Sequence, residues 1–416
     1  MRLIFRTTSK FVRGPKPFTP INNINYAKGV AVISFAALLF VGCRKSTDSA
    51  STTTEVCIVG NGIRNGVLID SQYIVLYKSS DGTSNTVVET EANLSTDVRL
   101  NAMLKRNGLT TSRILSRFNG GRGGFIARIS KQDARNIARD PLVETVEQDR
   151  IIALGSCFSV AAPTLLTWNI KKTGYGDGTG KTAWVIDTGI ESTHPDLNVD
   201  ISRSRSFITG DASFEDKNGH GTHVAGIIGA KNNLFGVLGV ASNASLVALK
   251  VLNGEGEGTL GGIIKALAYV NANAKAGDVV NISLGEEEAS DVFDSQVKQT
   301  AAKGIFITIA AGNDGKPATD FSPARANAPN IYTVSAIDSL NNFASFSNYG
   351  NDAVDFAAPG VHILSTYTNK RYAYLSGTSM AAPHVAGLLL LSGTKIQIAG
   401  YAKNDPDGNP DPISMK

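Results

Sequence analysis

The second half of the chain contains a series of apolar runs that alternate with segments of helical periodicity, and this pattern constrains the fold most. The apolar runs carry few polar residues, as strands that are buried on both faces require. Strands that alternate with helices predict an α/β domain of three layers, in which helices cover both faces of a mainly parallel sheet. The predicted strands are residues 182–187, 246–252, 279–285, 305–313 and 331–337, and the predicted helices are residues 221–230, 260–274 and 290–304.

Residues 71–154 predict a smaller, separate α+β unit. Apolar alternation marks its strands, helical periodicity marks its first helix, and Ser130 and Asp133 have the spacing of a capping box for its second helix. The order of elements predicts a ferredoxin-like sandwich. The predicted strands are 72–78, 112–118, 123–129 and 143–154, the helices are 95–108 and 131–140, and Gly120–Gly124 form a hairpin.

The N-terminus predicts export. Residues 2–28 carry several Lys and Arg residues and no acidic residue, and an apolar run then ends at Cys43. This run is too short to span a bilayer comfortably but suits a signal peptide over residues 1–42. Gly42 before Cys43 resembles a bacterial lipoprotein cleavage site, although Phe40 stands where Leu is usual. The alternatives are a lipid anchor on Cys43, or an ordinary secretory signal cut near Gly42. Residues 43–70 predict a flexible linker.

Composition excludes some other classes of function and structure. The formal net charge is only +4, and no basic stripe with interleaved aromatic residues suggests binding to nucleic acid. Three cysteines exclude a disulfide framework but leave one bridge possible. Cys157 is either lost on processing, free, or paired with Cys57. The polar, Pro-rich residues 401–416 predict a loose tail.

Three residues at the ends of predicted elements can form a nucleophilic catalytic site. Asp187 ends a buried strand, His220 begins a helix between two glycines, and Ser379 opens the apolar helix of the segment GTSMAAPHVAG. Together they supply a hydroxyl, an imidazole to accept its proton, and a carboxylate to orient the imidazole. Because sites in open parallel sheets lie at the carboxyl ends of strands, we expect these groups to meet there.

The surroundings of Ser379 favour stabilisation of an oxyanion. A helix start presents unpaired backbone N–H groups and a partial positive charge. Gly377 and Ala381 leave room for a substrate carbonyl, and Pro383 is expected in the first turn, where a missing N–H is tolerated. Asn313, after another buried strand, could supply a side-chain amide as the second donor.

With these motifs in the order Asp, His, Ser, the chain resembles the subtilisin-like serine proteases (subtilases, peptidase S8 family), nearest the proteinase K branch. The resemblance covers about residues 168–392. The 71–154 unit looks like the inhibitor I9-type propeptide of that family. The matching motifs are VIDTGI (185–190), HPDL (194–197), NGHGTHVAG (218–226), AAGN (310–313), FSNYG (346–350) and GTSMAAPHVAG (377–387).

The resemblance implies an exported serine endopeptidase that is made as a self-inhibited zymogen and acts as a monomer on polypeptide substrates. Ser379 would be the nucleophile, His220 the general base and then acid, and Asp187 the residue that orients it. Asn313 and the Ser379 N–H would form the oxyanion hole. The peptidase domain would span residues 155–400, with the cut from the propeptide within residues 152–162.

The resemblance also implies how a substrate would bind. Its backbone would add a strand between the edges at residues 281–285 and 254–260, with Ser283, Leu284, Gly285 and Gly256 as contacts. Glu286 stands where the family usually has glycine, and Glu287 and Glu288 follow it. One interpretation is an acidic rim that favours Lys or Arg in the specificity pocket, and the other is a solvated surface loop.

The family resemblance implies no cofactor for catalysis but a structural calcium ion. Its ligands would be the Asp355 carboxylate and the carbonyls of Pro329 and Ile331, since oxygen ligands suit calcium. The alternative is that Asp355 only makes local hydrogen bonds. The remaining histidines have no spacing that suggests ligands and are expected to be structural. They are His194, His223, His362 and His384.

Two other classes of function compete with the endopeptidase. One is a binding or scaffold protein that keeps the fold without activity, which a missing catalytic residue would have favoured. The other is an esterase that uses the same three residues. A cleft that adds a strand and an inhibitory propeptide favour peptide bonds.

Overall fold

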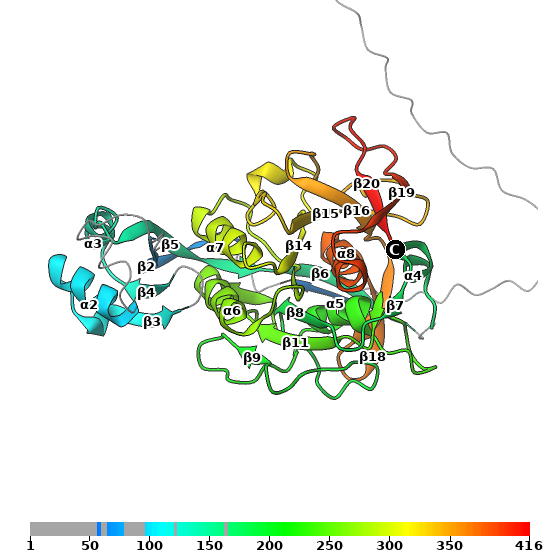
Figure 1. The fold of residues 1–416 in the computed structure, drawn as a ribbon, viewed down its shortest axis with the longest axis horizontal. Helices are drawn as coiled ribbons and strands as arrows, with labels where there is room; N and C mark the ends of the chain where they lie inside the picture. The colour runs from blue at the N-terminus through cyan, green and yellow to red at the C-terminus, as the bar shows by residue number, and fades with distance from the viewer. Residues whose placement is uncertain (1–55, 60–64, 79–95, 120–122, 162–164) are drawn as a thin grey trace, which may run out of the picture. The chain divides into compact units, whose positions relative to one another are not determined.

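The computed structural model describes residues 56–59, 65–78, 96–119, 123–161 and 165–416. The predicted signal peptide and Cys43 lie outside these residues. Helices in the described part of the chain are all too short or too polar to cross a membrane. The described residues divide into an N-terminal unit (residues 65–154) and a C-terminal domain (residues 155–416), and both appear in Figure 1.

The N-terminal unit has the predicted ferredoxin-like order. Its strands pair as β5-β2-β4-β3, all antiparallel. Ser130 and Asp133 form the predicted capping box at the start of the second helix. The elements are β2 (Leu68–Tyr77), α2 (Thr96–Arg106), η1 (Thr111–Arg113), β3 (Ile114–Phe118), β4 (Gly124–Arg128), α3 (Lys131–Ile137) and β5 (Val143–Ala153).

The C-terminal domain is built on a nine-stranded sheet in the order β19-β20-β16-β15-β14-β13-β8-β11-β9. Every pair in it is parallel except β19 with β20, as the alternating pattern predicts. The strands are β8 (Thr182–Asp187), β9 (Arg205–Ser206), β11 (Ser245–Lys250), β13 (Val279–Ile282), β14 (Phe306–Ala310), β15 (Ile331–Ile337), β16 (Val354–Pro359), β19 (Gln397–Tyr401) and β20 (Pro412–Met415).

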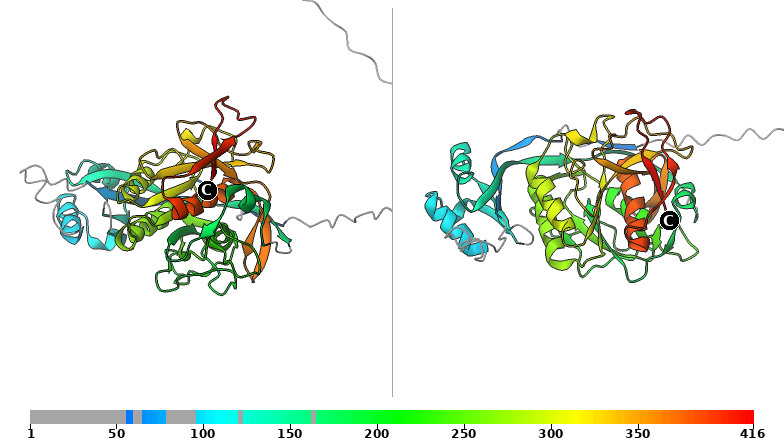
Figure 2. Two further views of the ribbon diagram at one scale, coloured as in Figure 1. Left: turned by 45° about the vertical axis from the view of Figure 1, so that its right-hand side comes forward. Right: turned by 45° about the horizontal axis from the view of Figure 1, so that its top comes forward.

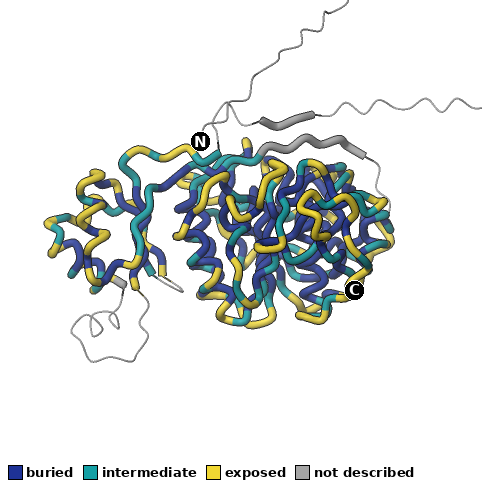
Figure 3. Tube along the Cα trace, turned by 90° about the horizontal axis from the view of Figure 1, so that it is seen from above, coloured by how far each residue is buried: buried dark blue, intermediate teal, exposed yellow. Residues whose placement is uncertain are grey.

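Helices cover both faces of this sheet, and the alternation along β8 shows why. Trp184 and Ile186 belong to the apolar cluster of α6 (Leu260–Asn273) and α7 (Asp291–Ala301). Ala183 and Val185 belong to the cluster of α5 (His220–Gly229) and α8 (Thr378–Ser392). Figure 2 shows the two helical layers, and Figure 3 shows that buried residues are concentrated in the interior of the domain. Successive side chains of a strand point to opposite faces, so both faces need apolar residues.

A second, four-stranded sheet has the order β1-β6-β18-β17, and all its pairs are antiparallel. Its register makes Cys57 and Cys157 directly opposite partners. The remaining elements are β1 (Val56–Val59), β6 (Gly155–Ala161), α4 (Trp168–Thr173), β7 (Gly176–Asp177), β10 (Ala241–Ser242), β12 (Glu257–Thr259), η2 (Ala318–Asp320), β17 (Ile363–Tyr367) and β18 (Arg371–Leu375).

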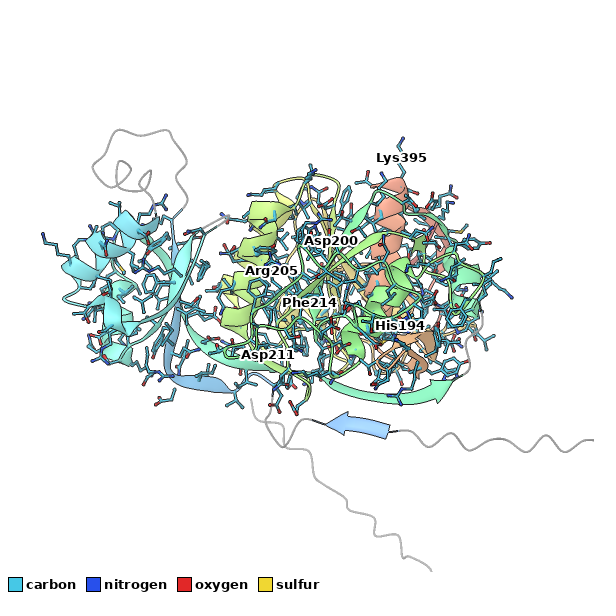
Figure 4. The ribbon with its side chains drawn as sticks, turned by 90° about the horizontal axis from the view of Figure 1, so that it is seen from below. His194, Asp200, Arg205, Asp211, Phe214 and Lys395 are labelled. Carbon is cyan, nitrogen blue, oxygen red and sulfur yellow. The ribbon has the colours of Figure 1, made fainter. Side chains whose placement is uncertain are left out.

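The prediction of a loose tail over residues 401–416 was wrong. After Lys395, which lies at the end of α8 in Figure 4, the chain forms the hairpin β19–β20. β20 extends the main sheet beside β16. Ile413 is fully buried, and the Ser335 hydroxyl donates a hydrogen bond to the buried Asp411 carboxylate. The tail is therefore part of the sheet, and its Ala402 and Ile413 enter one small core with Ile337, Phe343 and Ala357.

Candidate active site

Asp187 and His220 form a buried pair at the carboxyl end of β8. Nδ1 of His220 lies 2.8 Å from Oδ1 and 2.9 Å from Oδ2 of Asp187. The backbone N–H of Thr188 donates a further hydrogen bond of 2.7 Å to Oδ1. Both side chains are covered, with 3% of His220 and none of Asp187 exposed. The carboxylate therefore holds the imidazole ring in one orientation and leaves Nε2 for another partner.

The contact with Asp187 also determines the pKa of the His220 imidazole. Burial alone would lower the pKa of His220, because it penalises the charged form. The charge of Asp187 and its hydrogen bond outweigh this effect, with help from Asp216, and raise the pKa of His220 above 6.5. An imidazole of this kind accepts a proton near neutral pH and holds it beside a carboxylate.

Two glycines allow α5 to approach β8 so closely. Gly219 has φ +115°, and a Cβ there would lie 2.2 Å from the ring of Tyr367. A Cβ on Gly221 would lie 2.2 Å from the carbonyl oxygen of Gly189 and 3.1 Å from Oδ1 of Asp187. Gly221 is therefore a steric requirement of the Asp187 contact, and Gly219 is required by the close packing of Tyr367 and by its positive φ.

Asp216 organises the turn before α5, and the sequence analysis missed it. One of its oxygens accepts hydrogen bonds from the Thr188 hydroxyl and from the N–H groups of Asn218 and Gly219. The other accepts from the N–H and hydroxyl of Thr222. These bonds tie the end of β8 to the start of α5. An acidic residue four positions before His220 was the only sequence signal for this role.

Buried Lys250 also lies near this end of β8 and was missed. Its Nζ donates to the carbonyls of Thr188 (2.6 Å) and Leu252 (2.8 Å). Burial lowers its pKa, and the charge of Asp216 opposes that effect.

Ser379 is the second residue of α8 and is placed as predicted, at the helix start. Its hydroxyl donates to the carbonyl of Ser283 (3.1 Å), and the Ser283 hydroxyl donates back to the carbonyl of Ser379 (2.8 Å). The second bond explains why a proline is tolerated at position 383, inside the helix. The expectation that Pro383 lies in the first turn was wrong. Pro383 is the sixth helical residue, so it leaves the carbonyl four positions earlier without its helical donor. Ser283 supplies the donor instead.

Asn313 lies beside Ser379 with its amide oriented by the start of α8. Its Oδ1 accepts hydrogen bonds from the N–H (2.8 Å) and hydroxyl (3.0 Å) of Thr378. The amide nitrogen therefore remains as a donor. Asn313, Ser379 and His220 line one cavity of about 310 Å³, together with Ser283, Leu284 and Gly285.

The N-terminal unit occupies the cleft next to this cavity. The end of β5 pairs antiparallel with β12, and the N–H of Leu154 donates to the carbonyl of Gly256 (2.8 Å). On the opposite edge, Asn65 Nδ2 donates to the carbonyl of Gly285 (3.0 Å), and Asn65 Oδ1 accepts from the N–H of Ala153 (3.1 Å). The chain thus adds its own strand to one edge directly and to the other through an asparagine. Sequence analysis missed Asn65.

Two carboxylates of β5 hold the N-terminal unit on helices α6 and α7. Asp149 accepts a hydrogen bond from the N–H of Gly261 at the start of α6 (2.9 Å). Glu147 accepts from the Ser290 hydroxyl (2.9 Å) and the Val292 N–H (3.2 Å) at the start of α7. Negative charge is favourable at both helix starts. Burial raises the pKa of both carboxyl groups, and their hydrogen bonds oppose the rise.

Glu286 lines the cavity that contains Ser379, but its side chain is covered and is not part of a solvated loop. Its side chain is fully covered, and Oε2 lies 3.1 Å from Nε of Arg150 on β5, an ion pair without hydrogen-bond alignment. Burial raises the pKa of Glu286 to about 8, and the guanidinium of Arg150 opposes this rise. Glu288 is exposed and pairs with the same guanidinium at 3.2 Å, while Glu287 is exposed and lies at the rim of the cavity.

The other predicted residues have local partners. Asp355 accepts a hydrogen bond from the N–H of Thr333 (2.8 Å). The histidines expected to be structural contact backbone or aromatic groups. His223 bonds to the carbonyls of Ile363 and Ala373, His384 to the carbonyl of Met380 and to Asn169, His194 (Figure 4) packs edge-on against Tyr372, and His362 stacks on Tyr374.

The arrangement can perform acyl transfer. It places a hydroxyl and a carboxylate-bound imidazole in one cavity, with an amide donor at a helix start. Among the described residues, no group of three or more His, Cys, Asp or Glu side chains could hold a metal ion.

Comparisons with known proteins agree with this chemistry. The model of the subtilase family matches residues 178–400, and the model of peptidase inhibitor I9 matches residues 72–154. An alkaline protease of Alkalihalobacillus alcalophilus is 39% identical over 289 residues, which cover 66% of this chain and 72% of the relative. Subtilisin BL of Lederbergia lenta is 44% identical over 233 residues, which cover 55% and 83%. The crystal structure of a cold-adapted subtilisin-like serine proteinase superposes with a TM-score of 0.50 and 38% identity, covering 55% of this chain and 85% of that chain.

Proposed function

This chain belongs to the subtilase family and is a serine endopeptidase made with an I9 propeptide, and we propose that Asp187, His220 and Ser379 are its catalytic residues. The observation that carries this assignment is the bidentate Asp187–His220 contact in a cavity that also contains Ser379. We refer below to the N-terminal unit as the propeptide and to the C-terminal domain as the peptidase domain.

The reaction begins when the Ser379 hydroxyl turns from the carbonyl of Ser283 toward Nε2 of His220. His220 takes the hydroxyl proton as Ser379 Oγ attacks the carbonyl carbon of the substrate. Asp187 stabilises the imidazolium that forms. His220 then gives the proton to the leaving amine, the peptide bond breaks, and an acyl-enzyme remains on Ser379. Water, deprotonated by His220, hydrolyses the acyl-enzyme and regenerates the free hydroxyl.

The negative charge on the carbonyl oxygen is stabilised by two donors. They are the amide nitrogen of Asn313 and the backbone N–H of Ser379 at the helix start. Thr378 supports this role, because its two hydrogen bonds fix which end of the Asn313 amide faces the cavity. A donor held in advance costs no reorganisation when the charge develops.

Substrate binding follows the strand that the propeptide places in the cleft. Gly256, which pairs with Leu154, would pair with the substrate backbone at one edge, and Ser283, Leu284 and Gly285 would form the opposite edge. In the zymogen these edges are already used, so the propeptide competes directly with substrate. Leu154 binds Gly256 just before β12, one residue beyond the last pair of β5 with β12, which supports a processing cut within residues 154–157.

Autoprocessing tests the assignment. Residues 44–416 and their Ser379→Ala variant would be expressed in parallel and followed by intact mass and N-terminal sequencing. Wild type should divide within residues 154–157, while the variant remains whole. If both remain whole and added protease releases no activity toward peptides, the scaffold alternative replaces the endopeptidase. Hydrolysis of esters without hydrolysis of peptides would support the esterase alternative.

Export is a further part of the proposal. The N-terminal signal-like segment supports secretion or attachment to the cell envelope, and Cys43 would carry lipid in the second case. Expression of the full chain in a bacterial host separates the two. If the wild type partitions into detergent and the Cys43→Ser variant into water, Cys43 carries lipid. If the wild type itself partitions into water, the segment is an ordinary secretory signal.

We also propose a structural calcium ion at Asp355, with the carbonyls of Pro329 and Ile331. The observation in its favour is the burial of the Asp355 carboxyl, which raises its pKa to about 6 with only the Thr333 N–H opposing. A cation would relieve that penalty. The hydrogen bond to Thr333 also fits the alternative that Asp355 makes only local hydrogen bonds, so the two are separated by thermal unfolding. A chelator should lower the melting temperature of the Ser379→Ala protein. It should not change the melting temperature of the same protein with Asp355→Asn.

A further inference from the structure

An ionic contact joins the propeptide to the peptidase domain at Glu286, one of the residues that line the cavity of Ser379. Arg150 of the propeptide meets two carboxylates of the peptidase domain, Glu286 at 3.1 Å and Glu288 at 3.2 Å. A third carboxylate, Glu147 of the propeptide itself, lies 3.0 Å from the same guanidinium. Only 8% of the Arg150 side chain is exposed and none of that of Glu286. This is a desolvated contact, and such contacts discriminate strongly between partners.

The peptidase domain fixes the position of Glu286 by its backbone. The N–H of Glu286 donates to the carbonyl of Ser322 (2.9 Å), where the two residues form an isolated antiparallel bridge. The carboxylate is therefore held at the end of the substrate-binding edge formed by residues 283–285. When the propeptide leaves, Arg150 leaves with it, and the carboxylate remains on the enzyme without this partner.

The strand register relates this carboxylate to the substrate. Leu154 is the propeptide residue whose N–H reaches Gly256 beside the catalytic cavity, and Ile152 and Ile151 pair with Gly258 and Thr259. A substrate that binds in the same register presents the side chain four residues before the Leu154 position to Glu286. A neutral side chain there would leave the carboxylate buried without a counter-charge, which is costly.

On these grounds, and resting on the proposed function, we infer that Glu286 is a specificity-determining residue that selects substrates with Arg or Lys at the position of Arg150. The selected side chain lies well before the cleaved bond. Glu286 would therefore select a side chain at a position before the pocket next to Ser379, whereas the acidic-rim interpretation placed the selection in that pocket. Glu288, which is 72% exposed, adds a weaker attraction.

The test uses mature enzyme and quenched fluorescent peptides of residues 148–160 with Cys157 replaced by Ser. The peptides carry Arg, Lys, Ala or Glu at position 150. Assays near pH 9 keep Glu286 ionised, since its pKa in the complex is about 8. Mass spectrometry of the products confirms that all peptides are cut at the same bond. We expect kcat/KM to be about tenfold higher with Arg than with Ala, and lowest with Glu.

Enzyme variants assign the preference to one residue. Glu286→Gln should reduce the ratio of Arg to Ala to about one, through loss of activity on the Arg peptide. Glu287→Gln removes the same charge one position away from the contact and should keep the ratio. The inference is overturned if wild type cuts the Arg and Ala peptides equally, or if both variants lower the ratio alike. Failure of wild type to cut any peptide would instead overturn the proposed function.

Discussion

Substitution of Gly221 tests whether the close approach of α5 to β8 creates the active site. In Gly221→Ala, the new Cβ would lie 2.2 Å from the carbonyl oxygen of Gly189 and 3.1 Å from the Asp187 carboxylate. Both neighbours belong to β8 or the turn after it, so neither can move without moving Asp187. Overpacking of this kind costs about 1–3 kcal/mol. Displacement of His220 by about 1 Å from its working position would cost roughly 100-fold in rate.

Gly262→Ala is the matched control, because this glycine also lies in the first turn of a buried helix. Its new Cβ would meet only Thr259 Oγ1 at 3.4 Å and the Phe207 carbonyl at 3.7 Å, which are ordinary contacts. Ala in place of Gly within a helix stabilises by about 0.5–1 kcal/mol. The control should therefore melt at or slightly above the wild-type temperature.

Two assays separate stability from activity. Thermal unfolding is measured at one scan rate in the Ser379→Ala background, so that autolysis does not interfere. There Gly221→Ala should lower the melting temperature by about 2–12 °C, at roughly 2–4 °C per kcal/mol. Peptide hydrolysis is measured with Ser379 intact and should fall about 100-fold. If Gly221→Ala melts and hydrolyses peptides like Gly262→Ala, the steric explanation of the glycine is refuted.

Two further predictions concern protonation and the C-terminal hairpin. Because His220 must be neutral to accept a proton and its pKa is raised, kcat/KM should fall as the pH decreases through a value above 6.5; an acid limb centred below 6.5 would contradict this. Ile413→Asp should lower the melting temperature by more than about 5 °C because it buries a charge, whereas Ile398→Asp, at a position 52% exposed in the same hairpin, should change it little.

The sequence by itself determined five strands of the main sheet, the helices between them and the meeting place of the catalytic groups. Apolar runs such as 182–187 have to be buried on both faces, and alternating strands and helices leave few arrangements other than a covered parallel sheet. Parallel strands end at one edge, so Asp187 and Asn313 were expected near each other, with the starts of the helices that carry His220 and Ser379. These are consequences of local pattern and chain direction.

Only the tertiary structure shows which segments come into contact when no local sequence pattern relates them. Residues 401–416 look polar and loose in the sequence, but β20 gains its hydrogen bonds from β16, a partner that no local signal identifies. The run of three glutamates left two interpretations open, an acidic rim and a solvated loop. Its role depends on Arg150, which arrives from another sheet.

The same reason applies to Asn65, Asp216 and Ser283. A single polar side chain has no periodicity to reveal its role, and each of these acquires its role from a backbone group that folding brings beside it. Burial then makes each contact necessary, because a polar group removed from water without a partner costs free energy that folding has to recover. Sequence pattern determines which segments are buried, and packing determines which polar groups meet there.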